Sequence, residues 1–84
     1  MSSHRKLIQR VLNNPNTVSF RELDRILTRE GWVKRGSKSG SSHHTYSMSG
    51  NETIITVPFK RPHVSAHYVR RVIELLSLEE KYGE

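Results

Sequence analysis

The histidines are the side chains of this sequence best suited to acid–base chemistry, because cysteine is absent and Asp and Glu together number only eight. His43 and His44 open the segment 43–48, whose alternating pattern predicts a strand. Consecutive strand residues point to opposite sides of a sheet. Tyr46 and Met48 are the larger groups and share a side with His44, so that side should face the core. His43 is therefore expected on the exposed side.

The charge of the chain makes a polyanion a candidate partner. Fourteen Lys and Arg residues against eight Asp and Glu residues give a net charge of +6. Between Gly31 and Ile73, Glu52 is the single acidic residue, and four of the five histidines lie there. The basic residues of that stretch are Lys34, Arg35, Lys38, Lys60, Arg61, Arg70 and Arg71. A basic surface attracts nucleic acids, although a solvated face that only aids solubility would explain the charge equally well.

Together these residues could cleave RNA without a metal. A neutral imidazole can exchange a proton with a ribose 2′-hydroxyl or with a leaving oxygen. Lys34, Arg35 and Lys38 would contact the phosphate and stabilise the charge that develops on it. The plainer interpretations are that His43 is an idle surface histidine and His44 a histidine at the edge of the core.

Other chemistries fit the sequence less well. His63 and His67 have i, i+4 spacing, but no nearby Asp or Glu completes a set of three metal ligands, so we expect no metal site. Gly36 and Gly40 fit neither common phosphate-binding glycine pattern, and no small-molecule cofactor is expected. Three aromatic residues could stack on bases, although core packing is their commoner use: Trp32, Tyr46 and Tyr68.

The elements that must position these residues follow from periodicity and turn signals. Ser19 and Glu22 form a predicted capping box at a helix start. Apolar spacing predicts helices over 5–12, 20–30 and 65–76, strands at 32–33, 43–48 and 53–57, a polar loop or strand end at 34–42, and a frayed tail at 79–84.

The order α-α-β-β-β-α predicts a single α+β domain over 1–84, with residues 1–16 as an N-terminal helical extension. Three short antiparallel strands need helices over one face. The other face is left to solvent or to a ligand. No segment is apolar enough for a membrane helix or a secretory signal, and a small domain without disulfides fits the cytoplasm.

Several motifs together resemble the HicA toxins, small mRNA interferases of HicA–HicB toxin–antitoxin systems. The resemblance rests on Arg35 and on four segments. These are Ser-Ser-His-His-Thr-Tyr (41–46), Thr-Val-Pro (56–58), Tyr-Val-Arg-Arg-Val-Ile (68–73), and Phe-Arg-Glu-Leu (20–23) followed by Leu27 and Gly-Trp (31–32). The resemblance covers about residues 5–76. It implies a fold like the double-stranded RNA-binding domain, ribosome-independent RNA cleavage, and neutralisation by a HicB-like antitoxin.

The same resemblance implies a catalytic role for His43, with Ser42 before it as an RNA contact and Tyr46 as the motif's aromatic residue. Ser41 stands where the family usually has Gly, and Gly40 is one residue away. The first hypothesis is therefore a toxin that cleaves mRNA. The others are a non-catalytic RNA-binding module of the same shape, and a protein-interaction domain whose basic face docks an acidic partner.

Overall fold

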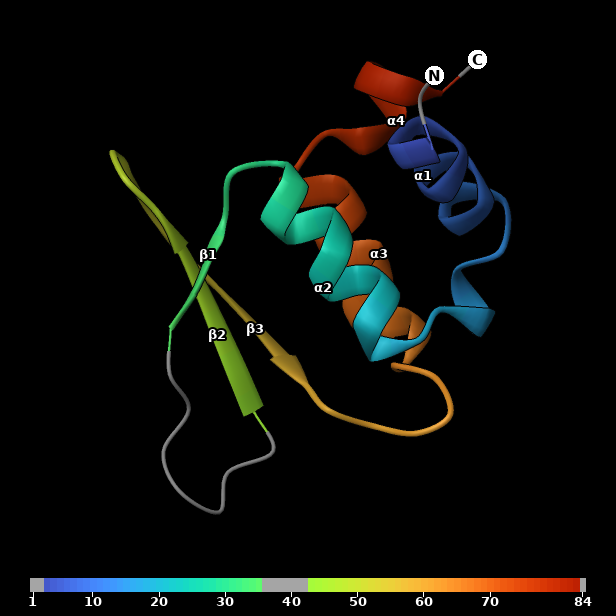
Figure 1. Ribbon diagram of the computed structural model, residues 1–84, viewed down its shortest axis with the longest axis horizontal. Coiled ribbons are helices and arrows are strands. Elements are labelled where there is room, and N and C mark those ends of the chain that lie inside the picture. The colour runs from blue at the N-terminus through green and yellow to red at the C-terminus, as the bar shows by residue number, and fades with distance from the viewer. Residues whose placement is uncertain (1–2, 36–42, 84) are drawn as a thin grey trace.

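Three antiparallel strands form an open sheet in the order β1-β2-β3, and the helices cover one of its faces (Figure 1). The computed structural model describes residues 3–35 and 43–83. The strands are β1 (Val33–Arg35), β2 (His43–Met48) and β3 (Asn51–Pro58). The helices are α1 (Ser3–Asn13), the 3-10 helix η1 (Pro15–Thr17), α2 (Phe20–Arg29), α3 (Ala66–Leu75) and α4 (Leu78–Tyr82). The predicted α+β architecture is confirmed.

The sheet is built around β2, because this strand pairs with both of its neighbours. Tyr46 lies between Lys34 of β1 and Ile55 of β3, and Thr45 lies between Arg35 and Thr56. Residues directly opposite each other in antiparallel strands share a face of the sheet. Lys34, Tyr46 and Ile55 therefore share one face of the sheet, and Arg35, Thr45 and Thr56 share the other.

A capping box begins α2, as predicted. The Glu22 backbone N–H donates to Ser19 Oγ at 3.2 Å, and the Ser19 backbone N–H donates to Glu22 Oε1 at 3.0 Å. At the other end, Gly31 adopts a φ of +98°, and a Cβ atom there would lie 3.3 Å from Met48 Cε. The chain thus turns sharply from α2 into β1 at a residue without a side chain.

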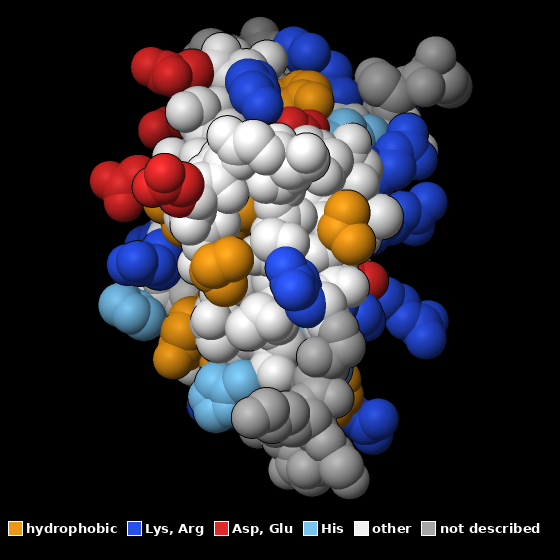
Figure 2. Space-filling view, turned by 90° about the vertical axis from the view of Figure 1, so that its left-hand side faces the viewer, with side chains coloured by type: hydrophobic (Ala, Val, Ile, Leu, Met, Phe, Trp, Pro, Cys, Tyr) orange, Lys and Arg blue, Asp and Glu red, His pale blue; other side chains and the backbone are white. Residues whose placement is uncertain are grey.

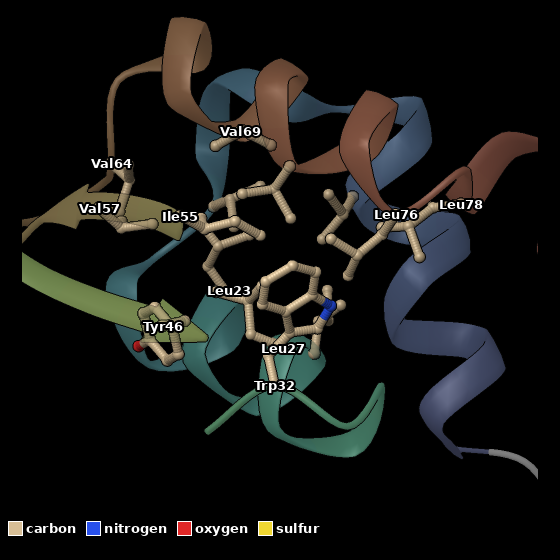
Figure 3. Packing of buried hydrophobic residues seen from close by; sticks show 14 of the residues in the cluster. Leu23, Leu27, Trp32, Tyr46, Ile55, Val57, Val64, Val69, Leu76 and Leu78 are labelled. Atoms are coloured by element: carbon tan, nitrogen blue, oxygen red, sulfur yellow. The ribbon is translucent and has the colours of Figure 1, made fainter. Parts of the chain in front are cut away.

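The core lies between the sheet and the helices (Figure 3). The sheet contributes Tyr46, Ile55 and Val57, all nearly inaccessible to solvent. The indole of Trp32, 5% exposed, packs in the same cluster. The helices supply most of the remaining core side chains: Ile8, Val11, Leu23, Ile26, Leu27, Val69, Val72 and Leu78. None of the described helices is both long and apolar enough to cross a membrane.

The prediction of a frayed tail is wrong for residues 79–82, because they belong to α4, whose first residue, Leu78, is fully buried. The carboxylate of Glu30, at the end of α2, binds this helix. Its oxygens lie 2.6 Å from the Tyr82 hydroxyl and 3.0 Å from Lys81 Nζ, both in α4. One of them also lies 2.8 Å from Nε2 of His4, in α1. Burial alone would raise the pKa of Glu30, but these hydrogen bonds outweigh it and lower that pKa from 4.5 to about 2. Contacts distant in sequence therefore order the tail.

Candidate nucleic-acid interface

His43 lies exposed at the first position of β2, opposite Pro58 of β3. Tyr46, three residues further along the strand, is fully buried among the helices. Strand alternation therefore puts His43 on the open face of the sheet, as the sequence predicted. Figure 2 views the molecule from this side, where histidine and basic side chains share the surface with scattered apolar groups.

His44 points the other way and is half-buried. Its ring centroid lies 4.8 Å from that of Phe20 in α2 and 6.5 Å from that of Phe59. The expected histidine at the edge of the core is thus confirmed. Its ring packs against these two aromatic side chains.

Arg35 shares the open face with His43. It lies opposite Thr45 in β2, and Thr45 is separated from His43 by one residue. The Arg35 guanidinium donates a hydrogen bond of 3.4 Å to Ser47 Oγ on the same face. A cation and an imidazole therefore stand on one exposed surface, as contact with a phosphate near His43 requires.

Lys34 does not lie beside His43, contrary to the sequence prediction. It is the β1 partner of the buried Tyr46, so its side chain leaves the sheet on the helix-covered side. Its Nζ lies 3.7 Å from Asp24 Oδ1 and 5.8 Å from the centre of the Phe20 ring. Adjacent strand residues point to opposite faces, so Lys34 and Arg35 cannot both lie beside His43. The prediction that both contact the same phosphate did not take this alternation into account. Lys38 and Ser42, the other predicted RNA contacts, lie outside the described residues.

The motif's aromatic residue, Tyr46, anchors β2 to α2 on the helix-covered side of the sheet. Its hydroxyl donates a hydrogen bond of 2.5 Å to Asp24 Oδ1 of α2. Burial, and then the bond to the Asp24 carboxylate and its negative charge, raise the pKa of Tyr46. The phenol therefore stays protonated and keeps donating. The bond fixes which side of β2 faces the helices, and hence which side carries His43.

A second basic surface lies on α2, before the basic stretch between Gly31 and Ile73 that the sequence prediction singled out. Arg21, Arg25 and Arg29 are exposed along one side of α2, and no ion pair between described residues involves them. The acidic residues of α2 are instead engaged by other groups, with Glu22 bound to Arg10. Basic side chains line the right-hand edge of Figure 2, the side on which α2 lies. The regular four-residue spacing was the signal that could have revealed them.

His63 and His67 lie outside the strands of the sheet. His67 is exposed near the start of α3, where its ring meets that of Tyr68 at a centroid distance of 5.2 Å, and His63 precedes that helix. Within residues 3–35 and 43–83, no three His, Asp or Glu side chains gather closely enough to hold a metal ion.

Comparison with known proteins identifies the family of this domain. A family model described as the HicA toxin of bacterial toxin–antitoxin systems matches residues 20–78. The match spans α2, the whole sheet and α3, so α1 and nearly all of α4 lie outside it. No curated protein and no solved structure matches the chain significantly. Because the family model covers well over half of the sequence and the observed fold agrees with it, this chain belongs to the HicA family of bacterial toxins.

Proposed function

We propose that this chain is the toxin of a type II toxin–antitoxin system and acts as a metal-independent mRNA endonuclease, with His43 as its general acid/base. The observation that carries the proposal is the exposure of His43 on the open face of the sheet, the face that also holds Arg35. Membership of the HicA toxin family supports the same role.

The chemistry needs little from the protein because RNA carries its own nucleophile. The neutral His43 ring accepts the proton of a ribose 2′-hydroxyl while that oxygen forms a bond to the adjacent phosphorus. The bond from phosphorus to the 5′-oxygen breaks, and the imidazolium returns its proton to that oxygen. The products are a 2′,3′-cyclic phosphate and a 5′-hydroxyl. Arg35 stabilises the negative charge that grows on the phosphate oxygens in the transition state.

A HicB-like antitoxin would neutralise this activity by covering the open face. Three exposed groups of that face offer it chemically different contacts: the Arg35 guanidinium, the His43 imidazole and the apolar side chain of Ile54, which is 54% exposed. An antitoxin with a carboxylate for Arg35 and an apolar group for Ile54 would exclude RNA from His43.

The test is cleavage of labelled RNA by the purified protein and by its His43→Ala variant. Removing a general acid/base lowers the rate by about 10²–10⁴-fold, whereas RNA affinity should change little. His67→Ala is the matched control, because it removes an exposed imidazole from α3 and should leave cleavage unchanged. Cleavage should also persist in EDTA.

Two results would overturn the proposal. Full activity of His43→Ala would exclude the assigned residue, and loss of activity in EDTA would exclude a metal-independent mechanism. RNA binding by the unmodified protein without any cleavage would instead identify a non-catalytic RNA-binding module. Growth arrest of a bacterial host on expression, relieved by co-expression of a HicB-like protein, would support the antitoxin partnership.

A further inference from the structure

Among the Phe, Tyr and Trp side chains of the described residues, that of Phe59 is the most exposed, with 41% of its surface accessible. It directly follows β3, and its ring packs edge-on against Phe20 at a centroid distance of 5.3 Å. His44 completes this group, which we call the Phe59 cluster. Two partly buried rings thus hold the Phe59 ring at the surface. There its exposure to water is unfavourable and it adds little to the packing of the core.

The surroundings of Phe59 are cationic. The Arg61 guanidinium carbon lies 5.3 Å from the centre of the Phe59 ring, within the range of a cation–π contact. A shallow hollow of about 210 Å³ adjoins the ring, and Arg21, Lys60 and Arg61 contribute to its lining. Of the described residues that line it, none is acidic. An exposed ring among cations is the arrangement that proteins use to bind single-stranded nucleic acid, with bases on the ring and phosphates on the charges.

The Phe59 cluster adjoins the proposed catalytic residue. Pro58 lies directly opposite His43, and Phe59 is the next residue in the chain. Opposed Cα atoms lie about 5 Å apart and consecutive ones 3.8 Å apart, so the Cα atoms of His43 and Phe59 are within about 9 Å. A strand of RNA that presents a phosphate to His43 can therefore bring a neighbouring base to Phe59 around the end of the sheet.

We infer that Phe59, with Lys60 and Arg61, forms a stacking subsite for an unpaired base of the RNA substrate. The inference rests on the proposed ribonuclease function and narrows its substrate class to single-stranded RNA. In a duplex the faces of a base are covered by its neighbours, so only an unpaired base offers a face to Phe59. Every base has such a face, and the subsite should accept all four. A protein partner would need a larger apolar area than one ring amid three cations.

Binding is best measured in the His43→Ala background, where the RNA stays intact. Fluorescence anisotropy would compare a short single-stranded RNA, the same RNA in a duplex, and a single strand with abasic positions. Phe59→Leu keeps an apolar contact with Phe20 but cannot stack. It should weaken binding of the single strand by about 5- to 150-fold, the range for loss of one base–aromatic stack. Binding of the duplex and of the abasic strand should change much less.

Two further variants guard against a mere folding defect. Leu75→Ala removes an apolar side chain that is similarly exposed, at 39%, on α3, and should bind RNA normally. Phe59→Trp keeps an aromatic ring and adds a fluorophore at the subsite. The native Trp32 is only 5% exposed, so a change in fluorescence on RNA binding would come from the new tryptophan. Its fluorescence should be quenched by the single-stranded RNA but not by the abasic strand.

The outcomes separate this subsite from the proposed function. Unchanged single-strand affinity in Phe59→Leu, with cleavage still dependent on His43, would overturn the subsite alone. Equal weakening of the single strand, the duplex and the abasic strand would overturn it as well. Loss of binding to a HicB-like antitoxin with RNA binding intact would reassign Phe59 to a protein interface. No RNA binding by the unmodified protein would overturn both proposals.

Discussion

Lys34 and Arg35 are neighbours in β1, yet they lie on opposite faces of the sheet. Arg35 lies opposite Thr45 on the open face, whereas Lys34 lies opposite the buried Tyr46 and reaches Asp24 of α2. The two residues carry the same charge and differ by one position in sequence. They therefore form a natural pair of variants for asking which face meets RNA.

Arg35→Ala should lower the salt dependence of RNA binding. Each phosphate neutralised in a single strand contributes about −0.7 to the slope of log K against log[salt], so the variant should lose about one such contribution. Lys34→Ala should change the slope less, because Asp24 already pairs with that lysine. Titrations at several salt concentrations measure both slopes. If Lys34→Ala had the larger effect, the helix-covered side rather than the open face would hold the RNA.

Tyr46→Phe should destabilise the fold without altering the exposed chemistry. The variant loses the hydrogen bond to the Asp24 carboxylate, a bond to a charged group worth about 1.5–3 kcal/mol. Urea unfolding measures the change in the free energy of unfolding. Tyr68→Phe is the control, because the Tyr68 hydroxyl makes no hydrogen bond within the described part of the chain. Its free energy of unfolding should stay within about 0.5 kcal/mol of that of the unmodified protein. Equal effects of the two variants would mean that the bond to Asp24 does not stabilise the fold.

Glu30 should make the protein sensitive to acid. Its pKa is about 2 in the folded protein against an ordinary 4.5, so the unfolded chain binds more protons between these values. The stabilisation is therefore complete above about pH 4.5 and is lost as the pH falls towards 2. Glu30→Gln should be less stable at pH 7 and should lose less stability over that range. The control is Glu52→Gln, which changes an exposed carboxyl on β3. Thermal melts at a series of pH values would measure both. If the melting temperatures of Glu30→Gln and of the unmodified protein fell equally with pH, Glu30 would not be the source of the acid sensitivity.

Ser19→Ala should cost about 0.5–2 kcal/mol through loss of the cap of α2. Cleavage per folded molecule at saturating RNA should stay unchanged, because the Ser19 side chain borders the hollow beside Phe59 but bonds to Glu22 and lies off the face that carries His43. Thermal melting and the RNA assay would be run on the same preparation. A variant with normal melting but impaired cleavage would show that the start of α2 takes part in the reaction.

The sequence by itself determined most of the local structure. The Ser19–Glu22 capping box, the alternation of 43–48 and the β-branched run of 53–57 each encode an element, and all three elements are present. Alternation also placed His43 on the exposed face and His44 at the edge of the core. These features depend on residues close in sequence, so periodicity and turn chemistry are enough to predict them.

Tertiary structure alone decided the features that join distant residues. The register of β1 against β2 separated Lys34 from Arg35, since a shift of one residue would have exchanged their faces. The tail became α4 because Leu78 enters the core and Glu30, about fifty positions away, binds Lys81 and Tyr82. The Phe59 cluster likewise unites residues from α2, β2 and the end of β3. No local pattern encodes such contacts, because their free energy arises only when the chain has folded and brought the partners together.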